Sequence, residues 1–153
     1  MKIDVALVKQ LRDETQASIA DCRNALEEAK NDIRKAHEIL REKGLARAAK
    51  KSDRAAEQGL VESYIHAGGK VGVLLEINCE TDFVARTDEF KTLAHEISMQ
   101  IAAMKPKSVK ILLEQEYIRD PSKKIGDMVK ETIAKLGENI IVNRFSRYEL
   151  GQE

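Results

Sequence analysis

The sequence of 153 residues contains no tryptophan, and aromatic residues make up only 4% of it. Proteins that bind single-stranded nucleic acid without sequence preference stack bases on such side chains, so the composition argues against this class. The 26 basic residues balance the 26 acidic ones, and no net field therefore attracts a polyanion or an anionic membrane surface. We expect no direct nucleic-acid partner.

Signals of export, of metal sites and of disulfide frameworks are also missing. The two cysteines, Cys22 and Cys79, have no metal-ligand spacing, and two thiols in a chain of this length require no disulfide. No apolar run approaches the length of a membrane span, and the first residues lack the apolar stretch of a signal peptide. We expect a cytoplasmic protein with no membrane partner.

Catalytic motifs are incomplete. His95-Glu96 begins the zinc-protease pattern, but Met99 stands where the second histidine is required. The other two histidines, His37 and His66, are isolated in the sequence, and no Gly-x-Ser-x-Gly nucleophile motif is present. We therefore expect no catalytic residue, no metal ligand and no cofactor, and a protein that is not an enzyme.

Three short helical patterns fill the first fifty residues. Asp4 can cap a helix that stops near Thr15-Gln16, and Ser18 with Asp21 resembles a capping box that opens a second helix. Helical spacing places three residues of this second helix inward, namely Ile19, Cys22 and Leu26. Helices this short are marginal alone, so we expect them to pack on one another.

Asn31-Asp32 breaks the second helix and caps a third, for which Gly44 is the expected C-terminal stop. The charged stretch from Ala46 to Ala56 reads as a linker or a helix extension, in preference to a phosphate-contacting patch. Residues 1–54 are thus predicted to form a three-helix module with a basic connector.

From Gly59 the hydrophobic pattern changes to the alternation of strands. Leu60–His66 and Val71–Asn78 flank Ala67-Gly68-Gly69-Lys70, which predicts a β-hairpin. An apolar helical stripe from Phe90 to Met104 follows and is closed by Pro106.

Residues 105–121 are expected to be irregular or weakly helical, with a boundary at Asp120-Pro121-Ser122. A second stripe from Ile125 to Leu136 stops at Gly137, and Ile140–Leu150 suggests a final strand. Helices followed by an antiparallel sheet with packed helices indicate the α+β class, with residues 55–153 as the core domain.

The junction after the hairpin contains Thr81, Asp82, Phe83 and Val84. It lies between the end of a strand and a capped helix start at Thr87. A phenylalanine in this position can fold inward as a core residue or project outward as an anchor for a partner. The local context leaves both interpretations of Phe83 open.

Two segments of the chain, residues 11–26 and Glu76–Arg86, resemble the bacterial-type elongation factor Ts family in order and separation. The run Gly137-Glu138-Asn139-Ile140 matches as well. Gln16 and Arg23 depart from the glycine and lysine that the family usually has. The resemblance implies an N-terminal three-helix module like the ubiquitin-associated domain, joined to an antiparallel-sheet core.

The same resemblance implies guanine-nucleotide exchange on elongation factor Tu during translation, with both the GDP-bound and the nucleotide-free forms as partners. The Thr81-Asp82-Phe83-Val84 motif is implied to displace the bound magnesium, with Phe83 as an exposed anchor. Ile19 is the candidate contact of the module, although helical spacing is equally compatible with core packing. The competing hypothesis is an adaptor that binds partners through the module and dimerises through the core.

The middle of the chain is short for the family, since Pro106–Leu112 is nearly all that remains of it. Short members pair through their sheets, so we expect a homodimer. An exposed final strand near Val142–Tyr148 would supply an unpaired edge for that contact.

Overall fold

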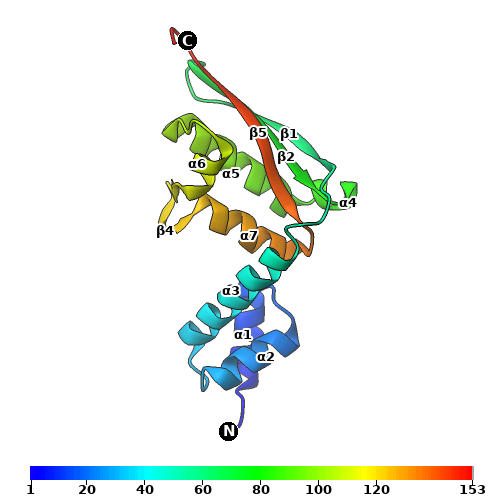
Figure 1. The fold of residues 1–153 in the computed structure, drawn as a ribbon. Coiled ribbons are helices and arrows are strands. Elements are labelled where there is room, and N and C mark those ends of the chain that lie inside the picture. The colour runs from blue at the N-terminus through cyan, green and yellow to red at the C-terminus, as the bar shows by residue number, and fades with distance from the viewer. Residues whose placement is uncertain (153) are drawn as a thin grey trace.

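The computed structural model describes residues 1–152 and places a three-helix module at one end and an α+β core at the other (Figure 1). The N- and C-termini lie at opposite ends of the molecule. Side-chain oxygens satisfy free main-chain donors at the start of each helix of the module. The caps are Asp4 for α1 (Val5–Thr15), Ser18 for α2 (Ile19–Glu28) and Asp32 for α3 (Ile33–Lys50). These three predicted helix starts are confirmed.

The module has a small apolar core of its own, formed by Leu11, Cys22, Ala25, Leu26, Ala29 and Ala36. The inward placement predicted for Ile19 is wrong, because its side chain is 56% exposed. The buried stripe of α2 begins one turn later, at Cys22. Ile19 therefore lies at the surface of the module.

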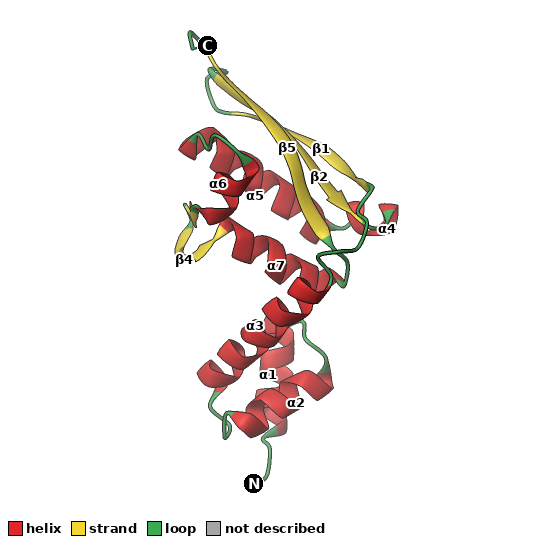
Figure 2. Cartoon of the chain, viewed as in Figure 1, coloured by secondary structure: helices red, strands yellow, loops and turns green. Residues whose placement is uncertain are grey.

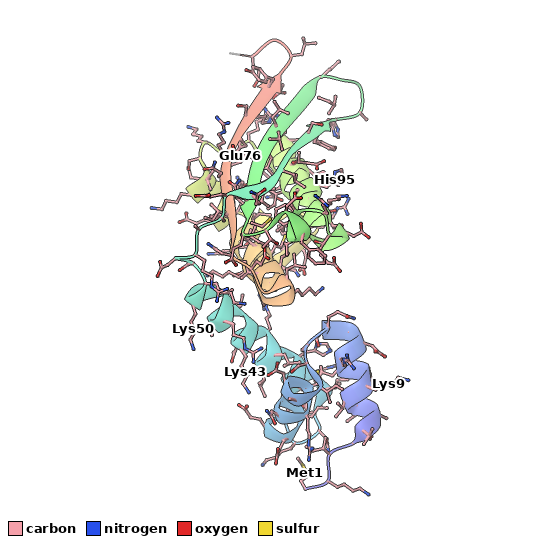
Figure 3. All side chains as sticks on the ribbon, turned by 90° about the vertical axis from the view of Figure 1, so that its right-hand side faces the viewer. Met1, Lys9, Lys43, Lys50, Glu76 and His95 are labelled. Carbon is pink, nitrogen blue, oxygen red and sulfur yellow. The ribbon has the colours of Figure 1, made fainter. Side chains whose placement is uncertain are left out.

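The expected helix end at Gly44 is also wrong, since α3 continues to Lys50 and includes residues 46–50 of the connector. Figure 3 labels Lys43 and Lys50 along this helix. A Cβ atom on Gly44 would lie 3.2 Å from the Cβ of Ala134 on α7 (Ile125–Leu136). The glycine thus permits a close approach of two helices instead of ending one.

Helix α3 belongs to both parts of the molecule. Its first half contributes Ala36 to the core of the module, whereas Ala48 in its second half is buried in the larger core. The expected division at residue 54 falls between α3 and β1 (Gln58–Ile65), and it remains a prediction.

Three antiparallel strands form the main sheet in the order β1-β2-β5, with β2 (Val71–Cys79) in the centre and β5 (Ile140–Glu149) at one edge (Figure 2). Alternate side chains of β2 point into the core and are buried: Val73, Leu75, Ile77 and Cys79. The predicted hairpin and final strand are confirmed.

Helices α5 (Asp88–Met104), α6 (Val109–Glu114) and α7 cover one face of this sheet (Figure 1). The apolar stripes predicted for the two longer helices supply most of the core: Phe90, Leu93, Ile97 and Ile101 from α5, and Ile125, Val129 and Ile133 from α7. Gly137 ends α7 in the left-handed conformation with φ 77°, as its position in the sequence predicts. Together these elements confirm the α+β class.

Between α5 and α7 the structure is more regular than predicted. It contains α6 and a two-stranded sheet of β3 (Glu116–Tyr117) and β4 (Asp120–Lys124). The side chain of Gln100 is fully buried; it donates to the oxygen of Glu116 at 3.0 Å and accepts from the nitrogen of Ile118 at 3.1 Å. An amide from α5 therefore supports these short strands, a contact that local sequence patterns do not reveal.

Candidate functional site

The candidate site begins where β2 ends at Cys79 and the chain turns into the short helix α4 (Asp82–Ala85), at the end of the sheet nearer to the module (Figure 1). Thr81 caps this helix, since its Oγ1 accepts a hydrogen bond from the nitrogen of Val84 at 3.3 Å. The thiol of Cys79 donates to the carbonyl oxygen of Thr81 at 3.1 Å. The junction predicted from the sequence is thus a capped turn of helix.

Exposure divides the residues of α4 into two groups. Val84 and Ala85 are each only 5% exposed and pack in the main core, whereas the side chain of Phe83 is 81% exposed. Of the two interpretations of Phe83, the structure excludes the core residue. A single exposed apolar side chain is ordinary on a protein surface, so the significance of Phe83 depends on how α4 is held.

Two threonines hold α4 at its ends. Thr81 caps the start, and Thr87, the cap of α5, donates from Oγ1 to the carbonyl oxygen of Val84 at 2.7 Å. The buried side chain of Val84 secures the inner face. Phe83 is therefore presented from a short helix with a fixed backbone.

Asp82 faces solvent beside Phe83 and forms an ion pair with Arg86. Surface ion pairs of this kind contribute little to stability because water competes for both groups. The carboxylate of Asp82 can therefore exchange Arg86 for a group on a partner at small cost.

Two glutamates that were given no role from the sequence complete the site. Glu138 accepts hydrogen bonds from the nitrogen of Thr81 at 2.9 Å and from its Oγ1 at 2.7 Å. Glu80 accepts from the nitrogen of Asn139 at 2.8 Å. The only sequence signal for Glu138 and Asn139 was the matching run Gly137–Ile140, and no local pattern places this run beside Thr81.

Ile19 lies apart from these residues. It is the first residue of α2 in the module, whereas Thr81, Asp82, Phe83 and Val84 lie on the core (Figure 1). The structure therefore brings four of the five candidate residues together and leaves Ile19 as an exposed position on a separate element.

Comparison with known proteins identifies the family. The family model described as elongation factor TS matches residues 80–153. Elongation factor Ts of Coprothermobacter proteolyticus is 48% identical over 197 residues, covering 99% of this chain and 100% of that protein. The protein of the same name from Thermotoga neapolitana is 44% identical over 196 residues and is covered completely. The chain belongs to the elongation factor Ts family.

Membership in the elongation factor Ts family confirms the resemblance inferred from residues 11–26 and Glu76–Arg86. The alignments extend over 195 to 197 positions, whereas this chain has 153 residues. These elongation factor Ts relatives therefore carry residues that this chain lacks.

Neither cysteine and none of the three histidines belongs to a metal-binding cluster in the part of the chain that the structure describes. Burial raises the pKa of the Cys79 thiol and keeps it protonated as a donor. His37 contacts Glu14 at 2.5 Å, whereas His66 and His95 lie near Tyr64, elsewhere on the chain. Among residues 1–152, no group of three or more His, Cys, Asp or Glu side chains could hold a metal ion. None of the helices in this range is long and apolar enough to cross a membrane.

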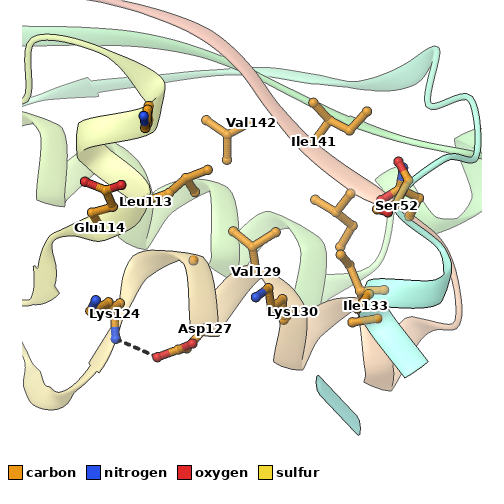
Figure 4. Close-up of a pocket in the computed structure, with 16 residues that line it drawn as sticks. Ser52, Leu113, Glu114, Lys124, Asp127, Val129, Lys130, Ile133, Ile141 and Val142 are labelled. Atoms are coloured by element: carbon orange, nitrogen blue, oxygen red, sulfur yellow. Dashed lines mark hydrogen bonds between the residues drawn. The ribbon is translucent and has the colours of Figure 1, made fainter. Parts of the chain in front are cut away.

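A groove between α6, α7 and β5 is also lined by residues of α3 and by Asn139, the partner of Glu80 (Figure 4). Its apolar lining includes Leu113, Val129, Ile133, Ile141 and Val142. At its rim Asp127 accepts from the nitrogen of Lys124 at 3.1 Å, the dashed line of Figure 4. None of the five candidate residues lines this groove.

Proposed function

We propose that this chain promotes the release of GDP from elongation factor Tu, and that Thr81-Asp82-Phe83-Val84 does so by displacing the bound magnesium ion. Membership in the elongation factor Ts family supports the exchange role. The observation that carries the magnesium mechanism is the 81% exposure of Phe83 beside Val84, which is 5% exposed. The helix thus has one side fixed in the core and one aromatic side chain free to enter a partner.

A bound magnesium ion makes the nucleotide site of elongation factor Tu sensitive to small displacements of the ligands of the ion. The ion is held by few protein ligands together with phosphate oxygens and demands near-ideal octahedral geometry. A side chain that shifts one of those ligands weakens both the ion and the nucleotide. Coupling between two ligands is reciprocal. A protein that binds nucleotide-free elongation factor Tu more tightly than the GDP-bound form must therefore weaken GDP binding to the same extent.

Each residue of the motif has a separate role in this mechanism. Phe83 enters an apolar pocket on elongation factor Tu, where burial of its ring contributes about 1.5–3 kcal/mol. Asp82 bonds groups of the partner, Thr81 holds the cap, and Val84 secures α4 to the core. The chain needs no cofactor of its own for this role and makes no covalent bond. It acts in the cytoplasm without contacting nucleic acid or a membrane.

The test is the release of a fluorescent GDP analogue from elongation factor Tu. Phe83→Ala should slow the stimulated release by about two orders of magnitude, as expected for an interface hot spot. Its thermal unfolding should match that of the unmodified chain because Phe83 is exposed. Ile111→Ala, which truncates a side chain 43% exposed on α6, is the matched control and should leave release unchanged.

Two results would contradict the magnesium mechanism. The first is stimulated release by Phe83→Ala at the unmodified rate. The second is binding of the unmodified chain to elongation factor Tu without any acceleration of release, which is the behaviour of the adaptor alternative.

Ile19 is proposed as a second contact, made by the module. Its side chain is 56% exposed, so Ile19→Ala removes contact area without opening a cavity. The variant should raise the concentration needed for half-maximal stimulation by roughly threefold to tenfold, as for a peripheral contact, and leave the maximal rate unchanged. A normal half-maximal concentration would remove Ile19 from the interface.

We further propose a homodimer that forms through the main sheet. The edge strand β5 leaves main-chain groups unpaired. The sheet face turned away from the helices carries exposed apolar side chains on or beside its strands: Val61, Ile65, Leu74, Tyr148 and Leu150. In register, Gly72 lies between Ile65 and Tyr148, and the side chain of Ile65 lies over it, since a Cβ atom on Gly72 would be 2.9 Å from Ile65 Cδ1. A two-fold axis brings such a surface against a copy of itself.

Light scattering after size-exclusion chromatography tests the dimer. The unmodified chain should elute with twice the mass of one chain. Leu74→Asp should elute with the mass of a single chain, because the dimer would then bury a charge at the centre of the contact. Ile111→Asp on α6 is the control and should remain dimeric. A monomeric unmodified chain at micromolar concentration would rule out the dimer.

A further inference from the structure

Two short segments of the core exchange hydrogen bonds between a carboxylate and the main chain. Glu138 accepts from the nitrogen of Thr81 at 2.9 Å, and Glu80 accepts from the nitrogen of Asn139 at 2.8 Å. The segments 80–81 and 138–139 therefore hold each other in both directions. We call this arrangement the reciprocal clasp. It joins the start of α4 to the turn between α7 and β5.

Glu138 provides what α4 cannot provide for itself. In a capping box, the third residue of a helix is Glu or Gln, and its side chain accepts from the nitrogen of the cap residue. In α4 this third residue is Val84, which is buried in the main core. Glu138, 57 residues away, takes over this function and also accepts from Thr81 Oγ1 at 2.7 Å.

The clasp also reaches the end of the module's long helix. The side chain of Asn139 is 3% exposed, and its Nδ2 donates to the carbonyl oxygen of Arg54 at 2.8 Å, in the segment that follows α3. The guanidinium of Arg54 lies 3.7 Å from the carboxylate of Glu80. The start of α4, the end of α7 and the segment after α3 thus meet in one hydrogen-bonded network.

We propose that Glu138 and Glu80 are positioning residues for nucleotide exchange, acting through α4 to hold Phe83 in one orientation. This inference rests on the proposed function. Without Glu138, the nitrogen of Thr81 loses its partner, and the cap of a four-residue helix depends on one bond of 3.3 Å from Val84. Phe83 then samples several orientations, and only a fraction of them fits the partner.

Substitutions at Glu138 test the proposal. Glu138→Ala should slow stimulated GDP release by roughly tenfold, equivalent to about 1.4 kcal/mol. Glu138→Gln should stay within about threefold of the unmodified rate, because its amide oxygen can accept from the nitrogen of Thr81 while its NH2 donates to Oγ1. Asp127→Ala is the control, since it removes a similar carboxylate bond from the nitrogen of Lys124, away from α4. It should leave release unchanged.

A double-mutant cycle separates positioning from a loss of general stability. If Glu138 acts through Phe83, adding Glu138→Ala to Phe83→Ala should slow release by less than about twofold. A full tenfold additional loss would overturn the proposal. Stimulated GDP release by Glu138→Ala at the rate of the unmodified chain would overturn it as well. If this variant does not fold, Glu80→Ala, which removes the bond to Asn139 and the ion pair with Arg54 but leaves Glu138 in place, replaces it in both measurements, with the same expected and contradicting results.

Hydrogen exchange of the Thr81 amide distinguishes this inference from the proposed function. Glu138→Ala should remove protection of that amide whether or not the chain acts on elongation factor Tu. If the unmodified chain stimulates no GDP release, the proposed function fails, and a loss of amide protection would still establish the clasp. If Phe83→Ala behaves as proposed but the amide of Thr81 remains protected in Glu138→Ala, the positioning role is refuted.

Discussion

Phe83 and Val84 are consecutive residues of α4, yet the side chain of Phe83 is 81% exposed and that of Val84 is 5% exposed. Successive residues of a helix point about 100° apart, so a helix lying on the core presents one of them to solvent and buries the other. The aromatic side chain, which has more apolar surface to bury, is the exposed one. The larger apolar side chain is thus the one that remains accessible to a partner.

Val84→Ala should therefore destabilise the fold, whereas Phe83→Ala should not. Removing the two methyl groups of a buried valine leaves a small cavity and should lower the free energy of unfolding by about 1–2 kcal/mol. Urea unfolding followed by circular dichroism measures both variants against the unmodified chain. Equal destabilisation by the two substitutions would contradict the opposite environments of these side chains.

If Phe83 acts by displacing magnesium, as proposed, removal of the ion should reduce the difference between the unmodified chain and Phe83→Ala. When a chelator strips the ion from elongation factor Tu, GDP leaves faster without help, and displacement of the ion no longer limits release. The ratio of unmodified to Phe83→Ala rates should fall from about two orders of magnitude to roughly tenfold or less. The measurement is fluorescent GDP release over a series of free magnesium concentrations. A ratio independent of magnesium would disprove displacement of the ion.

The close approach of α3 to α7 predicts that Gly44 tolerates no large side chain. A Cβ atom there would already lie 3.2 Å from the Cβ of Ala134, so Gly44→Leu should cost about 1–3 kcal/mol through overpacking. Adding Ala134→Gly should recover part of this loss and give a favourable coupling of at least about 0.5 kcal/mol. Urea denaturation of both single variants and the double variant measures this coupling. Purely additive losses would show that the two positions do not meet.

Acid should weaken the module through Asp21. Two hydrogen bonds from Arg47, at 2.8 and 3.1 Å, and one from Ser18 at 2.7 Å lower the pKa of the Asp21 carboxyl from 3.8 to about 2. Because the pKa is depressed in the folded state, these bonds stabilise the fold above pH 4. Their contribution is lost as the pH falls from about 4 to about 2.

Thermal unfolding between pH 2 and pH 6 checks this prediction. Asp21→Asn should give a flatter dependence of the melting temperature on pH than the unmodified chain over the lower half of this range. Asp13→Asn, which alters an exposed carboxylate of α1, is the control and should keep the normal slope. An unchanged slope in Asp21→Asn would show that this carboxyl does not govern acid sensitivity.

Predictions that depended on neighbouring residues were accurate. Ser18 and Asp21 form the cap expected from their spacing, and Gly137 ends α7 with the positive φ angle that its position required. Capping bonds and left-handed helix ends connect residues a few positions apart. Their signals are therefore contained in short stretches of sequence.

Predictions that depended on distant contacts were less accurate. Gly44 has the appearance of a helix stop, but its role is set by Ala134, far along the chain. Helical spacing placed Ile19 inward because spacing identifies a stripe and not its first buried turn. Gln100 and the strands that it supports were missed, since a buried amide is recognised only when its partners are known.

By itself the sequence determined the α+β class, the order of the longer helices and of the three strands of the main sheet, and the family to which the chain belongs. These properties follow from local hydrophobic periodicity, from turn residues and from short motifs. Tertiary structure alone decided that Phe83 faces solvent, that α3 continues past Gly44 and that Glu138 binds Thr81, the cap residue of α4. Each of these depends on which side chains meet after the chain folds, because burial and hydrogen bonding between distant residues have no local sequence pattern.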